Sequence, residues 1–229
     1  NMVHVSADKW KCKPGGWDKL NTEIFDPVLS AEDFPIIFNE PISEPERLTR
    51  FRSPYIDGDA LHFFLDDYRF ECLWNQPKKY AEKFRGMVIC SPDFSQYTDW
   101  NNNLNRWNHY RKQWLGAYFQ SEGAHVIPSV CWAGPESYQY CFSGIPKHSM
   151  VALSVVGCFK FSHEFSMGFD EMMMRLEPHT VLCLGEFDKV YKGNMQPHII
   201  QYSWSFKSRS ADKVNKRALI QQILPGVVA

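Results

Sequence analysis

The fold is decided by one stretch, residues 150–186, which reads MVALSVVGCFKFSHEFSMGFDEMMMRLEPHTVLCLGE. Two short apolar runs, 150–156 and 181–184, flank an amphipathic segment, 165–176, that has helical spacing and is closed by Pro178. Near-continuous apolar runs are typical of strands that are covered on both faces, and such strands belong to parallel sheets. The stretch therefore predicts two parallel strands that are joined by a right-handed helical crossover.

The same rhythm extends outward along the chain. Further apolar runs predict strands over residues 61–65, 87–90, 125–131 and 198–206, the last of them an edge strand. The segments between them predict helices over residues 67–74, 78–84 and 99–121. The fold class is therefore α/β, with a largely parallel sheet built from repeated βα units. Two architectures fit: a TIM-barrel-like (β/α) barrel, complete or incomplete, and an open doubly wound sheet.

Three regions differ in composition. Residues 1–60 contain six prolines and predict an extended N-terminal arm that packs on the main domain, with one short strand at 34–38. Residues 61–206 carry the strand and helix pattern and form the predicted β/α main domain. Residues 207–229 predict a basic C-terminal helix whose helical pattern begins at Ala211.

The composition excludes several classes of protein. With 44% hydrophobic and 15% aromatic residues, the 229-residue chain can build a core and is not a disordered protein. The formal net charge of -1 argues against a domain that binds nucleic acid through bulk positive charge. No signal peptide is visible, and no apolar run reaches the roughly 18 residues that span a membrane. Seven cysteines without a CxxC pair predict free thiols, and hence a cytoplasmic protein.

Carboxylates follow three of the predicted strands. Both architectures place function at the carboxyl ends of strands, where the sequence has Asp67, Asp93 and Glu186. We predict these three residues to be catalytic, because converging carboxylates can act as general acid and base. They could also bind a divalent metal ion through oxygen, and the sequence does not decide whether a metal is bound. The alternative is that Asp67 and Asp93 cap helices and that Glu186 lies in an exposed loop.

Other side chains near the strand ends predict a pocket for a flat or sugar-like ligand. The predicted substrate-binding residues are Asp66, Tyr68, Phe94, Trp132 and Trp204. Cys158 is the best-placed thiol for a nucleophile, but with no visible base we favour a buried, unreactive cysteine. The sequence has no GxGxxG, GxxxxGK[ST], GxSxG or HExxH motif, so it gives no support to the sites that these motifs form.

The predicted helix over residues 99–121 interleaves aromatic and basic side chains. They are Trp100, Trp107 and Trp114, with Arg106, Arg111 and Lys112. Such a pattern can stack and clamp single-stranded nucleic acid. We favour the simpler interpretation, in which the tryptophans pack on the sheet and the basic side chains are solvated, because any helix that covers a sheet needs an apolar stripe.

Five strings of sequence carry a family resemblance. They are HFFLDDYRFECLW (62–74), SPDFSQYTD (91–99), WLGAYFQSEGAHVIPSVCW (114–132), CFSGIPKHSMVALSVVGC (141–158) and RLEPHTVLCLGE (175–186). Together they resemble a domain of unknown function that occurs in bacteria, phages, prophages and plasmids. The resemblance covers roughly residues 60–187 and implies a cytoplasmic protein connected with mobile elements. It implies no activity, no cofactor and no catalytic residue.

The sequence leaves three classes of function open. We expect a hydrolase or transferase that uses the carboxylates on a nucleotide-like or nucleic-acid substrate. The alternatives are a non-catalytic module that binds nucleic acid or protein, through the tryptophan-bearing helix and the basic stretch 207–217, and a protein that binds a small molecule without changing it. The sequence does not indicate the oligomeric state.

Overall fold

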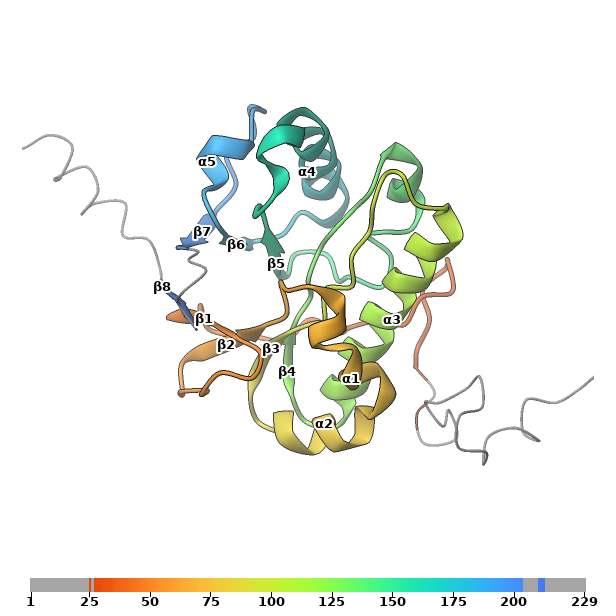
Figure 1. Ribbon diagram of the computed structural model, residues 1–229, viewed down its shortest axis with the longest axis vertical. Coiled ribbons are helices and arrows are strands. Elements are labelled where there is room, and N and C mark those ends of the chain that lie inside the picture. The colour runs from red at the N-terminus through yellow and green to blue at the C-terminus, as the bar shows by residue number, and fades with distance from the viewer. Residues whose placement is uncertain (1–24, 26, 204–209, 213–229) are drawn as a thin grey trace, which may run out of the picture.

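The computed structural model describes Phe25, residues 27–203 and residues 210–212, which form a mixed α/β fold (Figure 1). The strands are β1 (Arg47–Arg50), β2 (Asp59–His62), β3 (Val88–Cys90), β4 (His125–Ile127), β5 (Met150–Ser154), β6 (Thr180–Leu184), β7 (Ile199–Tyr202) and β8 (Ser210–Asp212). The α-helices are α1 (Glu71–Asn75), α2 (Pro77–Phe84), α3 (Asn102–Ser121), α4 (Ser162–Leu176) and α5 (Phe187–Val190). Short 3-10 helices are η2 (Asp67–Arg69), η3 (Pro135–Gln139) and η4 (Cys158–Phe161).

The strands from β1 to β7 follow one another in space in the same order as in the chain. One sheet has the order β4-β3-β2-β1-β8, and a second has the order β5-β6-β7. Every pair among β1–β4 and among β5–β7 is parallel, whereas β8 is antiparallel to β1. A single parallel bridge between Ser129 and Ala152 connects the two sheets beyond the end of β4. The predicted α/β class with largely parallel strands is confirmed.

The inner faces of these strands meet in one apolar cluster. Its members include Leu48, Ala60, Cys90, Ile127, Ala152, Leu182 and Ile200, one from each of β1–β7. Such a shared interior layer is the arrangement of a barrel. Within the described residues, however, no backbone ladder joins β7 to β1, and the Tyr202 hydroxyl instead donates a hydrogen bond to the Pro45 carbonyl at 2.7 Å. The barrel-like arrangement is therefore incomplete.

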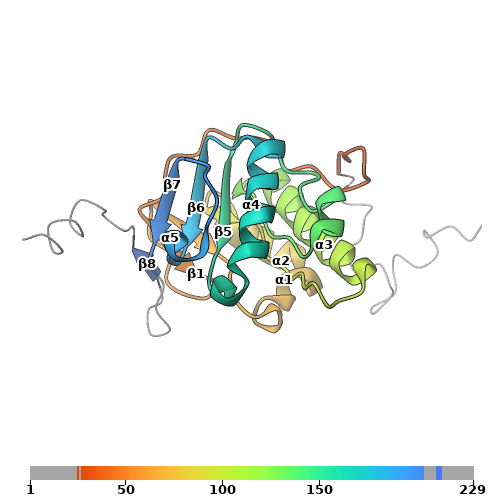
Figure 2. The same cartoon turned by 90° about the horizontal axis from the view of Figure 1, so that it is seen from above.

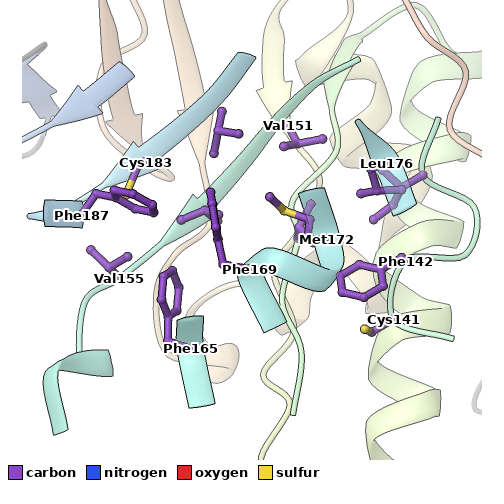
Figure 3. Close-up of a cluster of buried hydrophobic side chains, with 14 of the residues drawn as sticks. Cys141, Phe142, Val151, Val155, Phe165, Phe169, Met172, Leu176, Cys183 and Phe187 are labelled. Atoms are coloured by element: carbon purple, nitrogen blue, oxygen red, sulfur yellow. The ribbon is translucent and has the colours of Figure 1, made fainter. Parts of the chain in front are cut away.

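The outer faces of the strands pack against the helices. Figures 1 and 2 show α1–α3 on the side of β1–β4, and α4 and α5 on the side of β5–β7. In β6, Leu182 faces the inner cluster, while Cys183 joins Phe169 and Phe187 in the helix-covered cluster of Figure 3. Because successive residues of a strand point to opposite faces, a strand that is covered on both faces is apolar throughout. This explains the continuous apolar runs in the sequence.

The N-terminal region contains a strand that the sequence pattern does not reveal. β1 lies within the predicted arm, and its Arg47 and Thr49 side chains donate hydrogen bonds to the Asp59 carboxylate at 2.9 and 2.7 Å. Because these residues are polar, β1 does not appear as an apolar run in the sequence. Their side-chain donors are paired with the Asp59 carboxylate on β2. The strand expected at 34–38 does not form, and Pro35 makes only an isolated bridge with Leu29.

The region after β7 is described only in part. Ala211 and Asp212, which we expected at the start of a basic helix, belong instead to β8. The rest of the predicted helix, and Trp204 with it, lies outside the described residues. Among the helices that the structure describes, none combines the length and the apolar character that crossing a bilayer requires.

Candidate functional site

A pocket of about 890 Å³ opens at the carboxyl ends of β3, β4 and β5. Asp93 enters it from the loop after β3, Cys131 and Trp132 from the segment after β4, and Cys158 from the segment after β5. The first turn of α4 contributes Glu164. Ligand sites of parallel α/β folds occupy this end of the strands, because the loops there converge from several strands. The pocket is therefore the first place to look for function.

Asp93 is half-buried and is the least exposed of the three carboxyl residues that line the pocket. Burial raises the pKa of Asp93 to about 6, and the nearby charge of Asp67 also raises it. The charge of Lys112 and a hydrogen bond with the Cys131 thiol lower the pKa and so oppose this rise. Its Oδ1 atom is buried and has no hydrogen-bond partner. An unpaired buried acceptor is costly, so it is either satisfied by a bound molecule or retained for its chemistry.

Lys112 is a fully buried ammonium group behind the pocket, on α3. Its Nζ atom donates to the Cys131 sulfur at 3.3 Å, and the Gln96 amide donates to the same sulfur at 3.2 Å. The sequence suggested a solvated lysine here. The helical spacing of Lys112, Leu115 and Phe119, which places all three on one buried face, was the signal that could have found it.

Asp67 has a different place from Asp93. It does not line the pocket, and its carboxylate accepts hydrogen bonds from the Ser95 amide at 3.1 and 3.2 Å and from the Ser95 hydroxyl at 2.8 Å. Burial raises the pKa of Asp67, and the bonds from Ser95 oppose that rise. Asp67, at the start of η2, therefore connects the segment after β2 to the loop that carries Asp93.

The helix-cap alternative does not describe either aspartate. The residue before η2 is Asp66, whose side chain makes no capping bond, and α1 begins after Phe70. α3 is capped by Asn101, whose side chain accepts from the Asn103 amide at 2.9 Å. Neither Asp67 nor Asp93 occupies a cap position.

The remaining predicted residues are dispersed. Glu186 is exposed, pairs with Lys189 at 2.7 Å and does not line the pocket. Asp66 pairs with Arg69 at 3.0 Å on the surface, next to the exposed Tyr68. Phe94 is fully buried in the core, 3.9 Å beneath the Arg111 guanidinium. Of the residues predicted from sequence, the structure thus brings Asp93 and Trp132 together in one pocket.

Trp132 forms a wall of the pocket. Its ring lies 5.3 Å from that of Phe165, centroid to centroid. Gly168 of α4 lies so close that a Cβ atom at this position would overlap the indole ring. A glycine is needed there for the helix and the indole to approach each other.

The pKa values of the two pocket thiols lie above the ordinary value for cysteine. Burial, together with the charge of Asp93, raises the pKa of both Cys131 and Cys158. Because the thiolate is the nucleophilic form, neither cysteine is activated by its surroundings. In the part of the chain that the structure describes, no three His, Cys, Asp or Glu side chains are grouped so that they could hold a metal ion.

The basic side chains of the tryptophan-bearing helix α3 make contacts within the protein. Arg111 donates to Glu71 at 2.8 Å, Lys112 is buried, and the Arg106 guanidinium lies over the rings of Phe34 and Tyr140. Arg111 and Lys112 are thus engaged inside the protein, and Arg106 is half-buried over aromatic rings. Two of the three cations that the clamp hypothesis requires therefore do not face solvent.

The chain is similar to one family of domains and to two phage proteins. The model of a domain of unknown function, DUF4417, matches residues 38–203. The gene 1 protein of Mycobacterium phage L5 is 38% identical over 191 residues, which cover 79% of this chain and 83% of that protein. The gene 1 protein of Mycobacterium phage D29 is 35% identical over 190 residues, which cover 79% of this chain and 70% of that protein.

No solved structure matches the chain. The family model nevertheless spans well over half of the sequence, including every strand from β1 to β7 and all the residues of the pocket named above. Both phage proteins align over more than two thirds of their own length. The chain therefore belongs to the DUF4417 family, a domain of unknown function with relatives among phage proteins.

Proposed function

We propose that the chain is a hydrolase or transferase in which Asp93 moves a proton at the carboxyl ends of the strands. The observation that carries the proposal is the buried, unpartnered Oδ1 atom of Asp93 beside a pocket of about 890 Å³. A pKa of about 6 supports the role, because a carboxyl group that titrates near neutral pH can both accept and return a proton.

The surroundings of Asp93 suit this role in two ways. Burial pushes the carboxyl group toward its protonated form, while the charge of Lys112 keeps the ionised form accessible. In hydrolysis, Asp93 would take a proton from the attacking water and pass it to the leaving group. In transfer, it would take the proton from the acceptor substrate instead.

The pocket also bears on the nucleotide-like substrate expected from the sequence. Trp132, Tyr97 and Phe161 offer aromatic surfaces on which a flat ring could stack. Among the described lining residues, none is Lys, Arg or His, so no side-chain cation is available for a phosphate. A substrate that presents a ring or an amino group fits the pocket better than one that presents a phosphate.

Turnover by wild type and by Asp93→Asn tests the proposal. Both proteins would be incubated with a cell metabolite extract and with a panel of nucleosides, nucleotides and amines, and compound loss followed by mass spectrometry. Loss of a compound with wild type and not with the variant supports the proposal. Equal loss with both proteins, or no loss with either, contradicts it. Asp57→Asn, at an exposed turn, is the matched control.

A further inference from the structure

Two buried acceptors of the pocket have no hydrogen-bond partner. They are Asp93 Oδ1 and Gln96 Oε1, and both residues line the pocket. The orientation of Gln96 is fixed by its amide nitrogen, which donates to the Cys131 carbonyl at 3.4 Å and to the Cys131 sulfur at 3.2 Å. Because a carbonyl oxygen only accepts, the nitrogen must face Cys131, and the Gln96 oxygen must face elsewhere. Both oxygens are thus buried, unpaired acceptors on residues that line the pocket, and a ligand that reaches them must supply donors.

The charges around the pocket have one sign. Asp93, Asp99 and Glu164 line it, and none of the described lining residues is basic. Lys112 is buried behind the pocket, where its ammonium group donates to the Cys131 sulfur. Lys112 can balance one carboxylate, and the other two leave the pocket negative when they are ionised. A negative pocket favours a positively charged ligand and disfavours an anion.

The walls of the pocket are aromatic. Tyr97 and Phe161 are exposed at 49% and 61%, whereas Trp132 and Phe165 are largely buried. The faces of aromatic rings attract cations, most strongly where water is excluded. Aromatic walls next to acceptors and carboxylates are a common solution for recognising an organic cation.

We propose that the pocket binds an organic cation, with an ammonium or guanidinium group that donates hydrogen bonds to Asp93 and Gln96 and an apolar body that lies against Trp132. This inference rests on the proposed function, because it assigns a substrate class to the same pocket. It adds Gln96 as a binding residue. It also distinguishes the pocket from a phosphate site, since both unpaired groups are acceptors.

Binding to the full chain tests the inference. Agmatine and putrescine would be titrated by calorimetry, alongside adenosine, AMP and inorganic phosphate. We expect the two cations to bind and phosphate not to bind. Gln96→Met keeps the shape of the side chain and removes the acceptor, so it should weaken agmatine binding about tenfold. Glu164→Gln should weaken it less, and added salt should reduce that difference.

Controls keep the two proposals separate. Glu82→Gln makes the same charge change at an exposed position of α2, and it should bind agmatine as wild type does. Thermal melts of each variant alone show whether it is folded. Failure of both cations to bind, or equal binding to Gln96→Met and wild type, overturns the cation inference and leaves the role of Asp93 to the turnover assay. Cation binding without any turnover that depends on Asp93 supports this inference and contradicts the proposed enzyme.

Discussion

The carboxylate of Asp67 accepts hydrogen bonds from both the amide and the hydroxyl of Ser95, and so joins the segment after β2 to the loop after β3. Ser95 lies two residues beyond Asp93 in the chain. The contact therefore ties down the loop that carries Asp93. The structure thus gives Asp67, which the sequence predicts to be catalytic, a direct contact with the loop that carries Asp93.

Replacing Asp67 tests this positioning role. Asp67→Ala leaves the Ser95 donors without their partner and should lower the free energy of unfolding by about 1–3 kcal/mol. Asp67→Asn keeps one acceptor oxygen and should lose less. Urea denaturation of both variants measures the difference. If the two variants are as stable as wild type, the contact does not hold the loop.

Asp93→Asn should stabilise the folded protein at neutral and alkaline pH. The pKa of Asp93 is raised from 3.8 to about 6, so the folded state favours the protonated form and wild type loses stability as pH rises through this range. A neutral side chain avoids that loss, which amounts to at most about 3 kcal/mol. Urea denaturation near pH 8 should show the gain, and near pH 4 the gain should vanish. A variant that is less stable than wild type near pH 8 would contradict the burial argument.

His62 should make the protein sensitive to acid. It is buried at the end of β2, burial and the nearby charge of Arg50 lower its pKa from 6.5 to about 3, and its Nδ1 accepts from the Phe64 amide. The unfolded chain binds a proton below about pH 6.5 while the folded chain does not, so stability falls from there toward pH 3. At pH 5 the loss is about 2 kcal/mol.

His62→Asn can still accept the Phe64 bond and does not titrate. Melting temperatures between about pH 7 and pH 5 should fall less steeply for this variant than for wild type, although the missing ring lowers its stability at every pH. His163→Asn, at an exposed position of α4, is the control and should keep the wild-type slope. Equal slopes for His62→Asn and wild type would show that His62 is not held neutral.

Gly168→Ala should disturb the pocket from the helix side. An added methyl group meets the Trp132 indole, so the indole must move or the helix must shift, at a cost of about 1–3 kcal/mol. We expect a lower melting temperature and a changed tryptophan fluorescence spectrum. Met167→Ala changes an exposed neighbour on the same helix and should alter neither. If Gly168→Ala changes neither the melting temperature nor the fluorescence spectrum, the indole and the helix are not packed as closely as the structure shows.

The parallel strands could be predicted because they are buried on both faces. The runs around Val151 and Val181 are apolar throughout, since one face meets the inner cluster and the other meets the helices. β1 could not be predicted in this way. Its Arg47 and Thr49 are polar, and their partner Asp59 lies twelve and ten residues away, on the neighbouring strand.

The site was predictable only as far as strand ends locate it. Asp93 and Trp132 follow β3 and β4 and reach the pocket, but Glu186, which follows β6, is exposed and pairs with Lys189. A residue that follows a strand must lie at the carboxyl end of the sheet, but this position does not determine the direction in which its side chain points. Gln96 could not be predicted because its place in the site depends on a contact with Cys131, which the sequence does not display. For Lys112 the sequence pattern shows a buried helix face, but it does not show the contact with Cys131.

The antiparallel pairing of β8 with β1 has a consequence for the order of folding. Leu48 pairs with Ala211, so the two partners are separated by almost the whole described chain. A ribosome releases β1 early and β8 late, and until then the outer edge of β1 displays unpaired backbone groups. Closing such a long loop is slow, so this pairing should be the last part of the sheet to form. During synthesis the outer edge of β1 is thus the part of the sheet that is most exposed to pairing with a wrong strand or to binding by a chaperone.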